Sequence, residues 1–135
     1  MKSFSIFAFD FDLASTLECG QVFRWDKVGS NEYLGVIGHS IVRIRQEKSR
    51  LYVESSNRCI TPAFINSYFD LTLDLPYIYN TIRKDKHIKS AIERCYGLRI
   101  IRQPLWECVA SFIISTRNNI PRIKKIIDKL SRCFV

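Results

Sequence analysis

The sequence predicts an α+β fold, with an antiparallel sheet in the first half of the chain and helices after it. Between residues 32 and 55, apolar side chains recur at every second position in three runs joined by three-residue turns, which is typical of an antiparallel meander. From Thr61 onward the period changes to three or four residues, which indicates helices.

The first strands are expected on either side of a glycine turn. Alternating apolar residues over 7–13 predict a strand with one buried face. The chain then leads into a turn at Gly20, followed by a short strand over 22–25 in which Phe23 and Trp25 share a face.

The meander itself comprises strands over 32–37, 41–46 and 50–55. In the middle strand, arginines alternate with aliphatic residues, so one face of the sheet is expected to be in contact with water. We interpret Arg43 and Arg45 as part of this solvated face rather than as DNA contacts.

Three short helices are expected next. Thr61 is followed by a proline and predicts a capped helix start, and Asp74 does the same for the second helix. The third spans 85–95 and ends at Gly97. Residues 98–101 are β-prone and could return to the sheet.

Two longer helices complete the pattern. Pro104 begins a strongly apolar helix to Thr116, which we expect to be buried on nearly all sides. The next helix starts near Pro121. Its apolar stripe comprises Ile120, Ile123, Ile127, Leu130 and Phe134. The lysines away from this stripe, expected to be solvated, are Lys124, Lys125 and Lys129.

Composition indicates a globular protein with a polyanionic partner. The 135 residues suit one domain, or one domain and part of another, and 47% are hydrophobic. A net charge of +8 favours nucleic acid over a membrane surface, although a basic protein without such a partner is the alternative. No apolar run is long enough to span a membrane, and Asp10 and Asp12 interrupt the phenylalanine-rich start, so an intracellular protein is expected.

The five cysteines are odd in number and widely spaced, without a C-x-x-C pair. This pattern predicts buried free thiols rather than a disulfide framework or a metal site. We expect no metal and no cofactor.

The most promising local feature is the start of the last helix. Asn118 or Asn119 can cap it, Pro121 can fix its first turn, and Arg122 adds charge. Free amides at a helix start favour phosphate or a base edge, and the alternative is an ordinary capped helix with a basic surface. No nucleophile–base pair, carboxylate pair or phosphate loop stands out, so no catalytic residue is predicted.

Five motifs, taken together and in order, resemble the 8-oxoguanine DNA glycosylase family. They are Leu17-x-x-Gly20-Gln21-x-Phe23-Arg24-Trp25, Tyr33-x-Gly35-Val36, Tyr68-Phe69-x-Leu71, Tyr96-Gly97-Leu98-Arg99-Ile100-Ile101-Arg102-Gln103-x-x-x-Glu107-Cys108, and Ser111-Phe112-Ile113 with Asn118-Asn119-Ile120-x-Arg122-Ile123. The resemblance extends from about Phe11 to the end of the sequence.

The resemblance implies a curved antiparallel sheet with helices, of the TATA-binding-protein-like kind, over 1–102. It implies the first helices of an all-α catalytic domain over 103–135. The family's helix-hairpin-helix, Schiff-base lysine and helper aspartate have no counterpart here. We therefore expect an inactive N-terminal part of a glycosylase and AP lyase that removes 8-oxoguanine from duplex DNA.

The same resemblance implies a monomer whose partner is damaged double-stranded DNA, in the cytoplasm or nucleoid of a prokaryote or the nucleus of a eukaryote. Two alternatives stay open. One is a stand-alone, non-catalytic nucleic-acid-binding module. The other is a glycosylase of a sister family that removes alkylated bases, against which Gly20-Gln21 argues mildly.

The resemblance also implies roles for individual residues. Gly20 matches the glycine whose carbonyl accepts a hydrogen bond from N7–H of the flipped 8-oxoguanine. Asn118 and Asn119 match asparagines of the loop that enters the gap left by the base, and Arg122 matches the arginine that reaches the orphaned cytosine. Arg117, which we count with these DNA-binding residues, stands where the family more often has asparagine.

Overall fold

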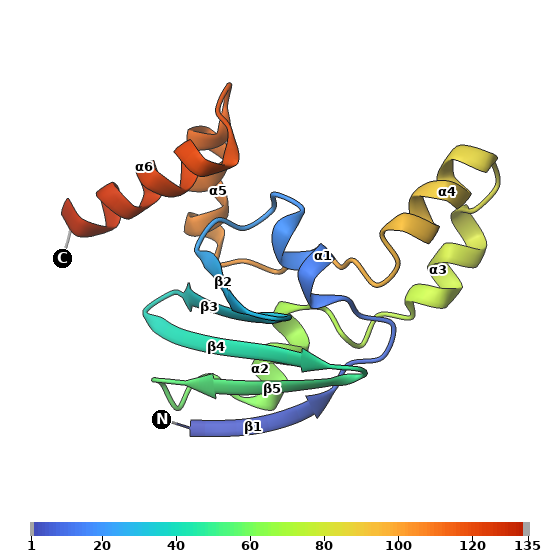
Figure 1. Cartoon of the computed structure of the whole chain (residues 1–135), viewed down its shortest axis with the longest axis horizontal. Helices are drawn as coiled ribbons and strands as arrows, with labels where there is room; N and C mark the ends of the chain where they lie inside the picture. The colour runs from blue at the N-terminus through green and yellow to red at the C-terminus, as the bar shows by residue number, and fades with distance from the viewer. Residues whose placement is uncertain (1, 134–135) are drawn as a thin grey trace.

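A five-stranded antiparallel sheet forms the base of the structure, a computed structural model that describes residues 2–133 (Figure 1). The strands lie in the order β1-β5-β4-β3-β2, so the N-terminal strand pairs with the last one. Their bounds are β1 Lys2–Phe7, β2 Trp25–Gly29, β3 Glu32–Ile37, β4 Ser40–Glu47 and β5 Arg50–Ser55. The predicted α+β class is confirmed.

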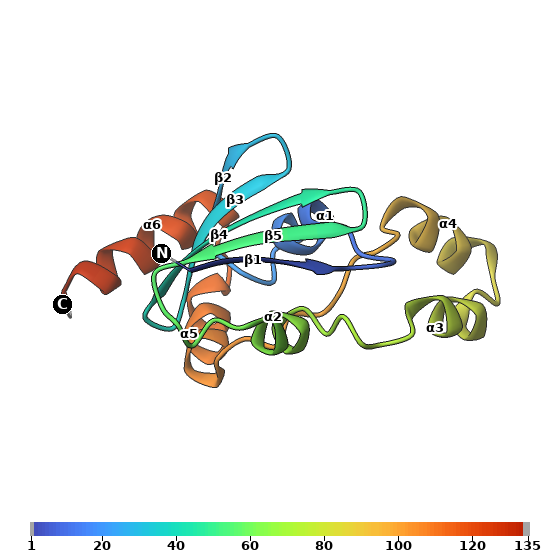
Figure 2. The ribbon, with the colours of Figure 1, turned by 90° about the horizontal axis from the view of Figure 1, so that it is seen from below.

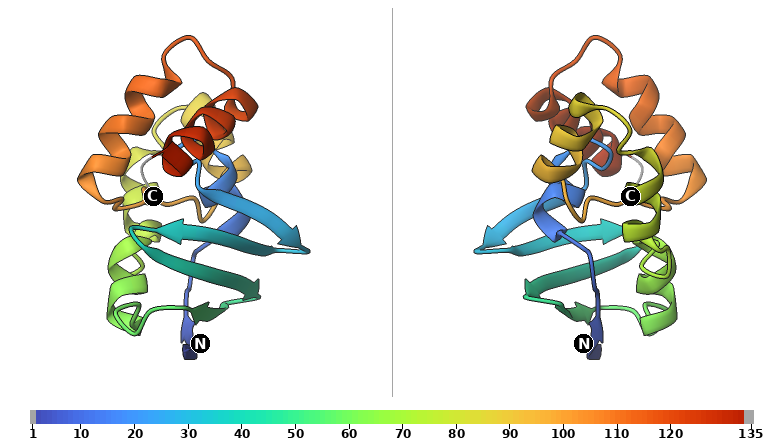
Figure 3. Two further views of the ribbon diagram at one scale, coloured as in Figure 1. Left: turned by 90° about the vertical axis from the view of Figure 1, so that its left-hand side faces the viewer. Right: turned by 90° about the vertical axis from the view of Figure 1, so that its right-hand side faces the viewer.

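The predicted meander over β3, β4 and β5 is confirmed in position and in facing. In β4, the side chains of Val42 and Ile44 are fully buried, whereas Arg43 lies on the open face and pairs with Glu32 at 3.5 Å. The helices lie on one side of the twisted sheet and leave the arginine-bearing side open (Figure 3). The alternation of apolar and polar side chains along the strands therefore predicted which face of the sheet the helices cover.

The predicted strand over 7–13 is wrong. The strand ends at Phe7, and Asp10 takes a left-handed backbone with φ of +49°. Asp12 then caps helix α1 (Leu13–Glu18) by accepting a hydrogen bond from the Ser15 amide. The alternating phenylalanines imitate a strand, but an aspartate before an apolar run is also an N-cap signal, and here the cap prevails.

The predicted strand over 22–25 is also displaced, because β2 begins at Trp25 and continues to Gly29. Trp25 pairs with Gly35, and its indole lies over that glycine. A Cβ added to Gly35 would be 2.3 Å from Trp25 Cδ2, so only glycine fits beneath the ring.

The three short helices are α2 (Pro62–Tyr68), α3 (Leu75–Ile82) and α4 (Lys86–Arg94), and the predicted caps at Thr61 and Asp74 are confirmed. Asp85, expected as the first residue of the third helix, is its cap. Thr61, Asp74 and Asp85 each accept a hydrogen bond from an amide in the first turn. Helices α3 and α4 form a hairpin that projects from the sheet at one end of the molecule (Figures 1 and 2).

No strand forms over 98–101. Arg99 is buried instead, and its guanidinium joins two loops. It donates to the carbonyls of Asp70 (2.7 Å) and Leu73 (3.0 Å), and to those of Phe9 and Asp10 (both 3.2 Å). Burial lowers the pKa of Arg99, an effect that nearby Asp10 and Asp70 oppose.

Helix α5 (Leu105–Ser115) is not buried on nearly all sides, and this prediction is wrong for the chain as it stands. Leu105 is 81% exposed, and Trp106 and Phe112 are each 76% exposed. In α6 (Ile120–Cys133), Ile123 of the predicted stripe is buried, whereas Phe134 lies outside the described residues. An all-round apolar pattern predicts that a helix will be covered, but it does not say by what.

Two expectations about surface and membrane can also be compared with the structure. Cysteines 19, 59, 95, 108 and 133 are free thiols at the surface, so the prediction of buried thiols is wrong. Across residues 2–133, no helix is both long and apolar enough to cross a membrane.

Candidate nucleic-acid interface

The turn after α1 brings two distant stretches of the sequence together at Gly20. Its φ is +88°, a conformation that side chains rarely adopt. A Cβ added here would lie 3.7 Å from Cδ1 of Ile120, which is ordinary contact rather than a clash. The backbone angle therefore requires glycine at this position, and the turn lies directly against the first residue of α6.

The side chain of Gln21 fixes this turn to the extended segment before α5. Its Nε2 donates to the carbonyls of Thr16 (3.0 Å) and Arg99 (2.7 Å), and its Oε1 accepts from the Ile101 amide at 2.8 Å. The Gln21 carbonyl in turn accepts from Gln103 Nε2 at 2.6 Å. One carboxamide thus replaces the strand pairing that residues 98–101 lack.

A cavity of about 180 Å³ lies beside Gly20, between the sheet and the start of α6. Its polar wall is a small network in which the Tyr33 hydroxyl donates to Glu18 at 2.6 Å and Lys27 pairs with the same carboxylate at 3.1 Å. These two contacts lower the pKa of Glu18, while burial and the carboxylate raise that of Tyr33. The full lining is Leu17, Glu18, Gly20, Val22, Trp25, Lys27, Tyr33, Ile120 and Lys124.

Lys124 closes this cavity by joining α6 to the sheet. Its ammonium donates to the carbonyl of Trp25 and pairs with Asp26 Oδ1 at 2.8 Å. The expectation that this lysine is simply solvated is therefore wrong. The ion pair links α6 to the start of β2.

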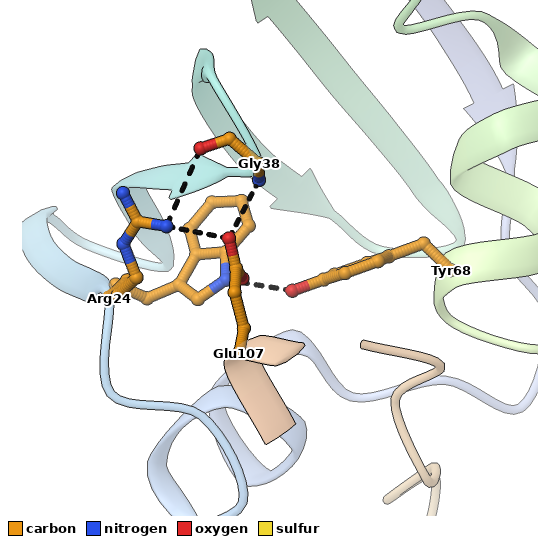
Figure 4. A network of polar contacts seen from close by, with 5 residues as sticks. Arg24, Gly38, Tyr68 and Glu107 are labelled. Carbon is orange, nitrogen blue, oxygen red and sulfur yellow. Dashed lines mark hydrogen bonds and ion pairs between the residues drawn. The ribbon is translucent and has the colours of Figure 1, made fainter. Parts of the chain in front are cut away.

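A second polar network fixes α5 to the sheet (Figure 4). Glu107 Oε1 accepts from Arg24 Nη1 at 2.6 Å and from the Gly38 amide at 2.9 Å. Beneath it, the Trp25 indole donates to the Tyr68 hydroxyl at 3.2 Å, and burial raises the pKa of Tyr68 to about 12. Arg24 lies four residues after Gly20 in the same motif, so this motif forms both the turn and the ion pair that attaches α5.

The loop between α5 and α6 carries three of the five predicted site residues, and a fourth, Arg122, lies in the first turn of α6. Arg117 is exposed and has a left-handed backbone with φ of +55°. Asn118 Nδ2 donates to the carbonyl of Ile114 at 2.7 Å, and Asn119 Oδ1 accepts from the Arg122 amide at 3.0 Å. Asn119 is therefore the cap that the sequence left undecided, and both asparagine side chains shape the loop.

The start of α6 offers an anion fewer free amides than the sequence suggested. Pro121 has no amide proton, and the Arg122 amide is already bonded to Asn119. Arg117 and Arg122 are both exposed, and neither side chain forms an ion pair within the described residues. The two guanidinium groups, rather than the helix amides, are therefore the groups available to bind a ligand.

The structure thus unites Gly20 with the helix that follows the predicted loop. Sequence reasoning did not find Gln21, Glu107 and Lys124 as the residues that hold this arrangement. Gln21 and Glu107 were visible within the family motifs, but their roles depend on contacts 80 and 83 residues away. Within 2–133, no group of three or more potential ligand side chains could hold a metal ion.

Comparison with known proteins gives consistent matches. A family described as "8-oxoguanine DNA glycosylase, N-terminal domain" matches residues 4–109. The curated N-glycosylase/DNA lyase OGG1 of Arabidopsis thaliana is 30% identical over 125 residues, covering 88% of this chain and 34% of that protein. The N-glycosylase/DNA lyase of Saccharomyces cerevisiae is 29% identical, covering 90% of this chain and 36% of that protein.

Solved structures agree. MBOgg1 in complex with a low-affinity DNA ligand superimposes with a TM-score of 0.91 at 35% identity, over 99% of this chain and 47% of the other. The 8-oxoguanine glycosylase/lyase of Clostridium acetobutylicum in its apo form gives 0.83 at 30% identity, over 93% of this chain and 44% of the other. Its complex with duplex DNA containing cytosine opposite 8-oxoguanine gives 0.79 at 29% identity, over 90% and 45%. The chain spans about a third of the length of the curated relatives it matches.

Proposed function

The chain belongs to the family of 8-oxoguanine DNA glycosylase N-terminal domains, and from this we propose that it acts in the removal of 8-oxoguanine from duplex DNA by a glycosylase and AP lyase. Its partner is damaged double-stranded DNA, and it works in the compartment that holds the DNA. The sheet with α1 to α4, over 1–102, is one domain, and the helices from 103 onward begin the catalytic domain.

The carbonyl of Gly20 distinguishes the oxidised base from guanine. Guanine has an acceptor at N7, whereas 8-oxoguanine carries a hydrogen there and is a donor. A carbonyl aimed at N7 therefore bonds the lesion and repels the normal base, a difference on the order of 1–3 kcal/mol. The left-handed Gly20 turn, fixed by Gln21, supports such a fixed acceptor.

The loop residues and Arg122 act at the gap left in the duplex and on the base opposite it. Arg117, Asn118 and Asn119 enter the gap that the flipped base leaves, and Arg122 reaches the orphaned cytosine. The rigid fork of an arginine has donors that match the two acceptors on the pairing edge of cytosine. No residue of this chain is proposed as the catalytic nucleophile.

The observation that carries this proposal is that Gly20 and Ile120 line the same cavity. The lesion-reading turn therefore lies beside the helix that follows the gap-filling loop, as a base-flipping enzyme needs. Flipping costs a few kcal/mol of unstacking, which the pocket and the loop have to offset together. The likeness to two glycosylases bound to DNA supports the same conclusion.

A binding experiment on the 135-residue chain tests the proposal. Fluorescence anisotropy would compare three duplexes: intact, with an abasic-site analogue opposite cytosine, and with the same analogue opposite adenine. We expect the abasic duplex with cytosine to bind tightest, because the unstacking cost is absent and Arg122 finds its base.

The matched variants are Arg122→Ala and Lys125→Ala, on the same exposed stretch of α6. The first should abolish the preference for cytosine over adenine, and the second should weaken all three duplexes alike. Equal affinity for all three duplexes in the unaltered chain would support the non-catalytic binding module instead.

A further inference from the structure

The positive charge of the protein lies in two separate places. Residues 105–133 hold six basic and two acidic residues, and residues 83–94 hold five basic and two acidic residues. The rest of the chain is almost balanced, with ten basic and nine acidic residues. The proposed function uses the first concentration of charge and leaves the second unexplained.

The second concentration is the basic turn of the α3–α4 hairpin, defined as Arg83, Lys84, Lys86 and Lys89. All four residues are exposed, and none forms an ion pair within residues 2–133. The carboxylate of Asp85, in their midst, accepts hydrogen bonds from the amides of the first turn of α4, at 2.8 and 3.0 Å. By contrast, arginines of the sheet face are paired, as Arg43 is with Glu32.

The hairpin holds these charges on an anchored element rather than a loose loop. The rings of Tyr79 and Tyr96 pack 5.2 Å apart, and the Tyr79 hydroxyl accepts from the Gly97 amide at 3.1 Å. Gly97 in turn bonds to the Asp12 amide at 2.9 Å, which ties the base of the hairpin to the start of α1. The basic turn therefore keeps a fixed place relative to the sheet.

The two basic regions lie at opposite ends of the longest dimension of the molecule (Figures 1 and 2). We propose that the basic turn of the hairpin is a second contact with the phosphate backbone of duplex DNA, separate from the lesion site and independent of sequence. This inference rests on the proposed function for one point, the identity of the polyanion as duplex DNA. Three of the four side chains that carry it are lysines, flexible point charges that suit phosphates rather than base edges.

A membrane surface is the other polyanion that such a turn could meet. Interfacial helices bury a wide apolar face in the lipid. The large apolar side chains beside the basic turn are Ile82 of α3 and Ile88 of α4, which are 42% and 37% exposed and form no wide apolar face. The observations therefore favour nucleic acid.

The test measures how DNA affinity depends on salt. The variant carries Lys84→Gln, Lys86→Gln and Lys89→Gln. The control carries Lys2→Gln, Lys48→Gln and Arg58→Gln, three exposed cations elsewhere that give the same net charge. Each phosphate contact contributes about 0.9 to the slope of log affinity against log salt concentration. We expect the hairpin variant to lose about 2–3 from this slope on an undamaged duplex and the control to match the unaltered chain.

Equal slopes for the two triple variants would overturn the proposal, because net charge alone would then account for binding. Binding of the unaltered chain to phosphatidylserine vesicles but not to DNA, lost in the hairpin variant alone, would overturn it in favour of a membrane. The abasic-duplex experiment is independent of it: a preference for cytosine with no effect of the hairpin variant would leave the proposed function standing and refute only the second contact.

Discussion

Arg24 and Glu107 lie 83 residues apart in sequence, and their side chains meet at 2.6 Å where α5 reaches the sheet. The two side chains are 28% and 19% exposed, so the pair is shielded from water more than a surface ion pair. Since α5 is otherwise largely exposed, this carboxylate is the main polar link between the helix and the sheet.

Two replacements of Glu107 should weaken the attachment of α5 to different extents. Glu107→Gln keeps an acceptor for the Gly38 amide but removes the charge, and should lower the free energy of unfolding by about 1 kcal/mol. Glu107→Ala also leaves that amide without its partner and should cost about 2–3 kcal/mol. Urea unfolding measures both, with Glu93→Gln on the exposed side of α4 as the control. Identical midpoints for all three variants would contradict this role.

Gly35→Ala should be far more damaging than Gly38→Ala. The first places a Cβ within 2.3 Å of the Trp25 ring and must displace the indole, at about 3 kcal/mol or more. The second meets nothing within 4 Å and has only its φ of +58° against it, at about 1–2 kcal/mol. Thermal melting followed by tryptophan fluorescence compares them, and a similar fall for both would show that the ring can move aside.

Gln21→Ala should release the segment before α5. The Ile101 amide and the Arg99 carbonyl would each lose a partner, at about 1–3 kcal/mol per group. Hydrogen exchange at the Ile101 amide should accelerate more than exchange within β4. Gln103→Ala removes one bond to the same turn and is the milder comparison. Unchanged exchange at Ile101 in the Gln21 variant would refute the role of the carboxamide.

Tyr68 predicts how the fold responds to alkali. Burial raises its pKa from 10.0 to about 12, so above pH 10 the unfolded chain loses this proton while the folded chain keeps it. The contribution of Tyr68 to the free energy of unfolding is fully present below pH 10. It falls as the pH rises towards 12, by up to about 1.4 kcal/mol per pH unit. Tyr68→Phe should flatten the curve of unfolding free energy between pH 10 and 12, and an equally steep curve would contradict the prediction.

The 135-residue chain should form no covalent adduct with DNA. Two lysines line the cavity beside Gly20. The ammonium of Lys124 is held by Asp26 and the Trp25 carbonyl, and that of Lys27 is paired with Glu18. A protonated amine in an ion pair has no lone pair for attack on a sugar carbon. Borohydride treatment with a duplex containing 8-oxoguanine opposite cytosine checks this, and a trapped complex that persists in denaturing gels would show the prediction to be wrong.

Local signals predicted much of the fold. The three central strands and the caps at Thr61 and Asp74 depend on neighbours within a few residues, and each is found where expected. The strands expected over 7–13 and 22–25 failed because an N-cap and the pairing of Trp25 with Gly35 outweighed the period of two.

The candidate site was predictable only in part. Gly20 and the loop asparagines came from a resemblance, and their roles on DNA stay predictions, as does the division at residue 102. The cavity that Gly20 and Ile120 share and the bond from the Ile101 amide to Gln21 could not be read from the sequence, because they bring together residues 80 to 100 positions apart. The exposure of α5 could not be predicted either, because an apolar composition does not show which surface packs against a helix.

Arg99 has a consequence for the order in which the protein can be built during synthesis. All five strands exist once Ser55 has been added, but the guanidinium that joins the loops at Phe9–Asp10 and Asp70–Leu73 is added about 44 residues later. At roughly 5–20 residues per second, the ribosome needs about 2–9 s to cover that interval. Until Arg99 has been added, the loop after β1 and the loop after α2 lack the cation that joins them.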